Sequence, residues 1–222
     1  TQVETLIDKA RVNSGMTEFS TRFLMSEWVN VIDPWQVASE ADYAKVPRTG
    51  RAKRLGAQQR ARLWPILDTV RQSIAKSGMF TWPQVMATVA NYYSSRETKP
   101  FTHIIVDEAQ DLGVSDLRML SALTPKSPNA LFFAGDLGQR IFVPPFSWGA
   151  LGVDVRGRST TLRVNYRTSH QIRQTADRLL PVSVRDADAL EDNRSGSVST
   201  FNGPEPKISN HADANLEVRH VA

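Results

Sequence analysis

Residues 101–111, Phe-Thr-His-Ile-Ile-Val-Asp-Glu-Ala-Gln-Asp, are the stretch from which the fold can be predicted. The run 103–106 is mostly β-branched and carries no acid, which is typical of a strand buried on both faces in a parallel sheet. Asp107 and Glu108 follow at once, with Asp111 three residues further on. Open α/β sheets bind their ligands at the carboxyl ends of their strands. The stretch therefore indicates either a Mg²⁺ site beside a phosphate or a strand that ends in a polar turn.

The composition is that of an ordinary globular protein. The chain has 222 residues, of which 41% are hydrophobic and 23% charged, so it is long enough to bury a core. It has no apolar run long enough to span a bilayer, and its first residues do not have the form of a signal peptide. The absence of cysteine suits a reducing compartment, so we expect a cytoplasmic protein.

Positive charge is concentrated in the first hundred residues. They carry 14 Lys and Arg against 9 Asp and Glu, whereas residues 101–222 carry 13 against 14. The run with no acid between Asp42 and Asp68 holds most of this excess. Such a run is either a solvated surface or a face that contacts nucleic-acid phosphates. The candidate phosphate contacts are Arg48, Arg51, Lys53 and Arg54.

The same hundred residues are expected to be nearly all helical. Apolar residues recur at helical spacing, and capping residues such as Ser39 and Thr81 precede several of the segments. The expected helices are 3–12, 19–32 (ended by Asp33-Pro34), 39–45, 57–76 and 82–94.

Alternating strands and helices are expected from about residue 99. Strands are predicted at 103–107, 130–134 and 159–164, with a further strand possible at 197–201, and helices at 115–123 and 168–180. Each of the first three strands ends in a polar signature. These are Asp-Glu-Ala-Gln-Asp at 107–111, Gly-Asp-Leu-Gly-Gln at 135–139 and Asn-Tyr-Arg at 165–167.

The three signatures, in this order and spacing, resemble motifs II, III and IV of the UvrD/Rep-type superfamily 1A DNA helicases. The segment from Trp28 to Trp64 resembles the helical insertion of bacterial members. The resemblance implies an α/β fold, a partial RecA-like (P-loop NTPase) parallel sheet preceded by an all-helical subdomain. It implies three parts: residues 1–98 (helical insertion), 99–158 (end of the first RecA-like domain) and 159–222 (start of the second).

The resemblance also implies roles for single residues. Asp107 matches the Walker B acid that holds Mg²⁺, and Glu108 the carboxylate that positions the attacking water. Gln139 matches the residue that senses the γ-phosphate. Tyr166 matches an aromatic that stacks on adenine, and Arg167 an arginine that neutralises transition-state charge.

One further aromatic carries over with the family's DNA-binding face. Phe142, three residues after motif III, matches the side chain on which a single-stranded base stacks. The family often has an aromatic-arginine pair after this position, whereas here Val143-Pro144-Pro145 follows.

The implied parent is an ATP-dependent DNA helicase that couples ATP hydrolysis, with Mg²⁺, to movement along single-stranded DNA, with a 3′-to-5′ direction and a place in DNA repair or replication. Its partners are ATP and single-stranded or duplex DNA. No Gly-x-x-x-x-Gly-Lys-Ser/Thr loop occurs in the chain, and the motifs expected after motif IV are missing. We therefore expect an internal fragment that does not hydrolyse ATP by itself.

Two alternatives remain open from the residues. The basic run alone favours a non-catalytic DNA-binding or partner-docking module, whose affinity would fall steeply with salt. The acids Asp107, Glu108, Asp111 and Asp136 could instead serve a Mg²⁺-dependent nuclease, although such sites need closely held metal ions.

Overall fold

A computed structural model describes the chain except at residues 52, 180–182, 186–187, 189–190, 194–195 and 222. The chain divides into two compact units, which are described separately. Unit 1 comprises residues 1–157 with 186–190, and unit 2 comprises residues 158–185 with 191–222. The finer division into parts 1–98, 99–158 and 159–222 stays a prediction.

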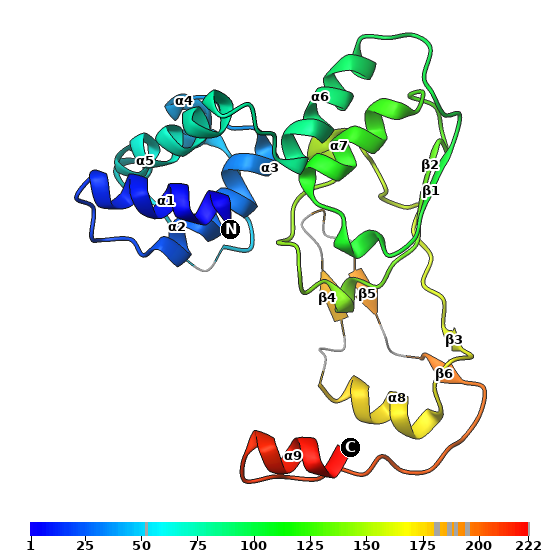
Figure 1. The fold of residues 1–222 in the computed structure, drawn as a ribbon. Coiled ribbons are helices and arrows are strands. Elements are labelled where there is room, and N and C mark those ends of the chain that lie inside the picture. The colour runs from blue at the N-terminus through cyan, green and yellow to red at the C-terminus, as the bar shows by residue number, and fades with distance from the viewer. Residues whose placement is uncertain (52, 180–182, 186–187, 189–190, 194–195, 222) are drawn as a thin grey trace. The chain divides into compact units, whose positions relative to one another are not determined.

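The N-terminal half of unit 1 is helical, as the periodicity predicts (Figure 1). Its side chains enclose an apolar core around fully buried Leu24, Tyr43, Leu63 and Leu67. Ser39 caps the fourth helix as expected, by accepting from the amide of Asp42. The elements are α1 (Gln2–Asn13), α2 (Thr21–Glu27), a π-helical turn η1 (Trp28–Ile32), α3 (Asp33–Trp35), α4 (Glu40–Lys45) and α5 (Ala57–Lys76).

The helix expected over 19–32 is interrupted and then continues past Asp33-Pro34. The wider turn η1 follows α2, and α3 runs on until Gln36 adopts a left-handed backbone (φ 53°). Pro34 is near the start of α3 and directly follows η1, in which the hydrogen bonds span five residues, as from the Asp33 N–H to the carbonyl of Trp28. The expectation that Pro34 ends the helix was therefore wrong by about one turn.

Asp33 connects α3 to α6 (Trp82–Ser94), which follows α5 in the chain. It is buried, and its Oδ1 accepts from Oγ1 of Thr81 (2.7 Å), which also caps α6. Burial raises the pKa of Asp33, while the hydrogen bonds from Thr81 and Gln36 lower it less. The folded chain therefore binds this proton more tightly than the unfolded chain does. The resulting stability is present below the ordinary carboxyl pKa and is lost as the pH rises through the raised value.

The rest of unit 1 contains helices and a small parallel sheet. Strand β1 (Ile104–Val106) pairs in parallel with β2 (Leu131–Phe133), with Ile104 opposite Leu131 and Val106 opposite Phe133. Helix α7 (Val114–Leu123) lies between the two strands in sequence and packs against α6 (Figure 1). The described residues of this part also form the short 3₁₀ turns η2 (Ala109–Asp111), η3 (Leu137–Gln139) and η4 (Gly149–Leu151).

The expectation that the strand within 103–106 is buried on both faces was wrong, and β2 is exposed on the same face. Val106, Leu131 and Phe133 pack against a buried cluster that includes Leu117 of α7. Side chains alternate along a strand, so the middle residues point to the opposite face. There Ile105 is 78% exposed and Phe132 is 60% exposed.

Unit 2 is smaller, and its described residues form two pairs of short strands. The strand expected at 159–164 is confined to its end, and the hairpin and the last helix were not predicted, because the segment after residue 183 is polar. The elements are β3 (Val164–Asn165), parallel to β6 (Val198–Ser199), α8 (His170–Asp177), β4 (Ser183–Arg185), antiparallel to β5 (Glu191–Asn193), and α9 (Ala214–Val221).

Candidate functional site

The acids of the first polar signature lie where β1 ends. Because β1 and β2 are parallel and in register, their carboxyl ends are neighbours. Backbone hydrogen bonds continue past the strands: Ala134 donates to the carbonyl of Val106 (2.8 Å), and Ala109 donates to the carbonyl of Ala134 (2.8 Å). Asp107 and Glu108 are exposed, as a site for a soluble ligand requires. The first two polar signatures therefore form one continuous edge of the sheet.

Glu108 adopts an unusual backbone conformation. Its φ is 52°, in the left-handed region, which costs a residue with a Cβ roughly 1–2 kcal/mol. The preceding carboxylate helps to hold the turn, since Oδ1 of Asp107 accepts from the backbone N–H of Glu108 (2.9 Å). Strained residues of this kind cluster at functional sites.

Gln110 is a buried polar residue of this turn, with a residue exposure of 5%. Its Nε2 donates to Oε2 of Glu108 (2.7 Å), and its Oε1 accepts from the backbone N–H of Asp136 (3.1 Å). No role was predicted for Gln110 from its sequence position. The available signal was an amide two residues after the second acid, a pattern that does not reveal burial.

The second polar signature is held by its own aspartate. Oδ1 of Asp136 accepts from the backbone N–H of Gly138 (2.8 Å), and its Oδ2 accepts from Nε2 of Gln139 (2.9 Å). The side chain of Gln139 is exposed in the turn η3. Asp107, Glu108 and Gln139, which were predicted from separate signatures, thus belong to one hydrogen-bonded arrangement.

Phe142 lies just beyond this turn and is 76% exposed. It lines a cavity of about 220 Å³ in unit 1, whose other walls include Trp35, Arg51 and Pro144. Most of the lining is apolar, as a surface for stacking a planar group would be.

Tyr166 and Arg167 belong to unit 2, where they follow β3. Asn165 organises their turn, since its Oδ1 accepts from the backbone N–H groups of Arg167 (2.8 Å) and Thr168 (3.1 Å). Tyr166 is 75% exposed, and Arg167 is also exposed. Both side chains are therefore accessible to a ligand.

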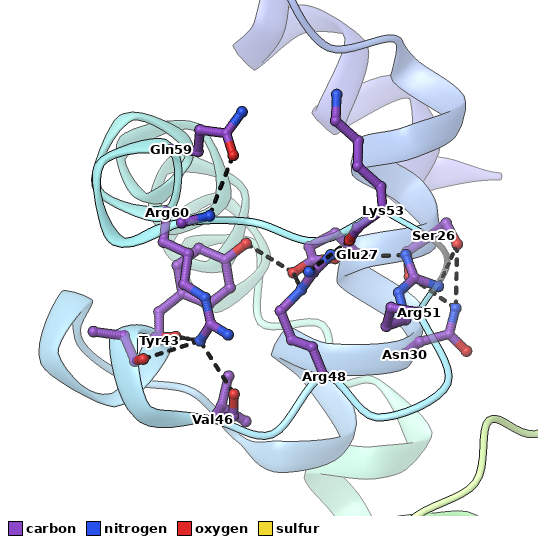
Figure 2. A network of polar contacts seen from close by, with 12 residues as sticks. Ser26, Glu27, Asn30, Tyr43, Val46, Arg48, Arg51, Lys53, Gln59 and Arg60 are labelled. Carbon is purple, nitrogen blue, oxygen red and sulfur yellow. Dashed lines mark hydrogen bonds and ion pairs between the residues drawn. The ribbon is translucent and has the colours of Figure 1, made fainter.

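Two arginines of the basic run are buried in an ion-pair network around Glu27. Figure 2 shows Arg48 and Arg51 directed toward this carboxylate, which is fully buried. Arg48 binds both oxygens, Nε to Oε1 (2.7 Å) and Nη2 to Oε2 (2.8 Å), and Arg51 approaches Oε2 at 3.5 Å. The Tyr43 hydroxyl donates to Oε1 (2.8 Å). Burial, followed by the negative charge of Glu27, raises the pKa of Tyr43.

The four cations that were predicted to contact nucleic acid differ in their exposure to solvent. The side chains of Arg48 and Arg51 are only 6% and 14% exposed, so they are committed to Glu27. Lys53 and Arg54 are exposed. The Nζ of Lys53 lies 4.3 Å from the ring centroid of Phe19, which places this ammonium over an aromatic face. The surface available to a phosphate is therefore limited to Lys53 and Arg54 of the four.

Two general features of the described residues concern metal ions and membranes. No three or more histidine or acidic side chains among them are grouped so that they could hold a metal ion by themselves. An exposed aspartate such as Asp107 can still take part in a metal site whose other ligands are phosphate oxygens and waters. In the same part of the chain, every helix is too short or too polar to span a membrane.

Comparison with known families identifies the chain's relatives. The model of the UvrD/REP helicase N-terminal domain matches residues 4–143, well over half of the chain. The matched region includes the helices of unit 1, the turn with Asp107 and Glu108, and Gln139. A search of the curated proteins and one of the solved structures find no match to this chain.

Proposed function

The chain belongs to the UvrD/REP helicase family, and from this premise we propose that it is part of an ATP-dependent motor that moves along single-stranded DNA. The proposed parent protein supplies the phosphate-binding loop that the chain lacks and works in DNA repair or replication with 3′-to-5′ direction. Its sheet is RecA-like, and β1 and β2 are two of its strands.

The observation that carries this proposal is the hydrogen-bonded edge where β1 and β2 end. A nucleoside triphosphate with Mg²⁺ needs a carboxylate near the metal, a second one near the attacking water and a neutral sensor near the γ-phosphate. Asp107, Glu108 and Gln139 are these residue types, they are exposed, and Gln110 and Asp136 connect them. This arrangement supports nucleotide hydrolysis over a polar turn without a role.

Each residue has a proposed task. Asp107 would bind the Mg²⁺ that neutralises charge on the β- and γ-phosphates. Glu108 would accept a hydrogen bond from the attacking water, and Gln139 would donate to the γ-phosphate. In unit 2, Tyr166 would stack on the adenine, and Arg167 would offset the charge that develops in the transition state.

DNA contact is proposed for two features of unit 1. Phe142 would stack on a base, because it is exposed beside an apolar cavity. Lys53 and Arg54 would contact phosphates, because they are the exposed members of the basic run's four candidates.

The test of the proposed function uses the parent protein with Glu108→Gln. This change keeps the size of the side chain but removes the charge that orients the water, so ATP turnover should fall by about 10²–10⁴-fold. Glu97→Gln, at an exposed position before β1, is the matched control and should leave turnover unchanged. Equal turnover in the wild type and Glu108→Gln would contradict the role of Glu108.

A second candidate function is a DNA-binding module without catalysis, and the exposure of Lys53 and Arg54 favours it. It predicts DNA binding by the 222-residue chain that weakens with salt and no effect of Glu108→Gln on any activity of the parent. Wild-type ATP turnover that single-stranded DNA stimulates would exclude it.

A further inference from the structure

We propose that Gln110 is a positioning residue that fixes the Glu108 carboxylate and connects it to the turn that carries Gln139. The inference rests on the proposed function, because it concerns the residue next to the catalytic carboxylate rather than a new reaction. Gln110 does not contact the nucleotide in this proposal. It acts through Glu108 on one side and through Asp136 on the other.

The contacts of Gln110 use both ends of its amide. The backbone N–H of Asp136 can only donate, so the atom that faces it must be the carbonyl oxygen. The NH₂ group consequently faces Oε2 of Glu108, at 2.7 Å, the short distance typical of a donor to a charged acceptor. Because Gln110 is buried, leaving either end without a partner would be costly.

Glu108 needs such a support because its own backbone is strained. A residue held at a φ of 52° tends to relax unless its surroundings fix it. The hydrogen bond from Gln110 engages Oε2 and so leaves Oε1 for the attacking water. Holding one oxygen of a carboxylate in this way restricts its rotation, which is how supporting residues improve the placement of a catalytic group.

Gly135 shows how closely the second strand end is fitted to Gln110. A Cβ added at Gly135 would lie 2.6 Å from Oε1 of Gln110 and 3.0 Å from the backbone nitrogen of Ala109. Atoms do not approach a Cβ so closely, so any larger residue at this position would displace the Gln110 side chain or the turn. The close contact, rather than a positive φ, explains the glycine.

The path continues from Asp136 to the proposed phosphate sensor. The backbone of Asp136 binds Gln110, while its carboxylate binds Nε2 of Gln139. A movement of Gln139 on contact with the γ-phosphate would therefore reach Glu108 through Asp136 and Gln110. The path is an unbroken series of hydrogen bonds at the edge of the sheet.

The first test replaces the amide with a carboxyl group, Gln110→Glu, in the parent protein. Two carboxylates with oxygens about 2.7 Å apart, the present Gln110–Glu108 distance, cannot both ionise, so the pair keeps one proton to an elevated pH. While protonated, the new side chain can still donate to Glu108. ATP turnover should therefore approach the wild-type rate at low pH and decline by up to about tenfold per pH unit above the pair's elevated pKa. The wild type should lack this decline.

The second test, Gly135→Ala, displaces Gln110 without changing a polar group. We expect a lower kcat at nearly unchanged KM for ATP, because binding does not depend on the orientation of Glu108. Gly56→Ala is the control, since it adds the same methyl group where no atom lies within 4 Å. Wild-type kcat in Gly135→Ala, or a Gln110→Glu pH profile identical to that of the wild type, would overturn the inference. If Gly135→Ala fails to fold, the Gln110→Glu profile decides.

A third measurement is independent of catalysis and uses the 222-residue chain. Hydrogen exchange at the Asp136 amide should be slow in the wild type and at least tenfold faster in Gln110→Leu, which removes the acceptor. Equal exchange rates in the two proteins would show that the hydrogen bond from the Asp136 amide to Gln110 does not form. A protected Asp136 amide in a parent protein without ATP turnover would contradict both the proposed function and the positioning role of Gln110, while leaving the hydrogen bond between Gln110 and Asp136 intact.

Discussion

Removing the charge of Glu27 should strongly destabilise the helical part of unit 1. The carboxylate is fully buried and faces Arg48, whose side chain is 6% exposed, and Arg51, at 14%. In Glu27→Gln, two guanidinium groups would remain buried with no negative partner. Breaking a buried ion pair on one side costs about 3–5 kcal/mol. Against the roughly 5–15 kcal/mol by which domains of this kind are stable, that is a large fraction.

A surface ion pair in the same part of unit 1 supplies the matched control. Glu18 and Arg62 form a 2.9 Å pair, but their side chains are 35% and 58% exposed. Exposed pairs contribute about 0–1 kcal/mol, because water and salt screen them. The variant Glu18→Gln should therefore lose at most about a third of the free energy that Glu27→Gln loses.

The assay is urea unfolding of the 222-residue chain, followed by the helical circular dichroism signal. The midpoint should move to lower urea in Glu27→Gln with an unchanged slope. A double-mutant cycle with Arg48→Gln should give a coupling free energy of about 1–3 kcal/mol. A loss below about 1 kcal/mol in Glu27→Gln would refute the buried network, and Arg48 and Arg51 would then return as candidates for DNA contact.

Three further predictions concern other features of unit 1. The variant Asp33→Asn keeps an oxygen that can accept from Thr81, so its free energy of unfolding should equal or exceed that of the wild type at pH 7 and lose this advantage toward pH 4. Urea unfolding across this pH range measures the difference. A wild type whose free energy of unfolding rises relative to that of the variant as the pH rises would contradict the raised pKa of Asp33. Lys53→Ala with Arg54→Ala should flatten the salt dependence of single-stranded DNA binding by about 1.4 in log–log slope, and an unchanged slope in fluorescence anisotropy would exclude these two contacts. Phe142→Ala should weaken single-stranded DNA binding by about 1–3 kcal/mol at constant salt, whereas wild-type affinity would show that no base stacks there.

The helices of unit 1 were predictable because their apolar spacing and their caps are local properties of the sequence. The segments expected at 57–76 and 82–94 agree with α5 and α6, and Thr81 caps the latter as expected. The exact course of the chain near Pro34 was less accessible. A π-helical turn depends on how the surrounding side chains pack, which a period of 3.6 residues does not describe.

The depth of charged residues could not be read from the basic run. Arg48 and Arg51 are spaced like surface cations, but they are buried because they pair with Glu27, more than twenty residues earlier in the chain. The useful signal was Glu27 itself, a single acid between the apolar residues Leu24 and Trp28 on a helix. A lone acid on a buried face needs a partner, and arginines are suited to supply it.

The first two polar signatures were expected to follow strands, and they lie at the ends of β1 and β2. That these two strands are neighbours comes from the structure, in which they pair in parallel and in register. The contacts of Gln110 could not be predicted, because they depend on the turn around Glu108, whose backbone is in the left-handed region. A sequence pattern does not predict a left-handed backbone conformation for a glutamate, which rarely adopts one.

We propose that the edge formed by Asp107, Glu108 and Gln139 hydrolyses ATP in a DNA-dependent motor. The most direct measurement is steady-state ATP turnover by the parent protein with Mg²⁺, with and without single-stranded DNA, for the wild type and Glu108→Gln. Turnover that DNA stimulates in the wild type and that is about 10²–10⁴-fold lower in Glu108→Gln is the predicted result. Turnover in Glu108→Gln equal to that of the wild type, or no turnover by the wild-type parent in the presence of DNA, would contradict this role of the edge.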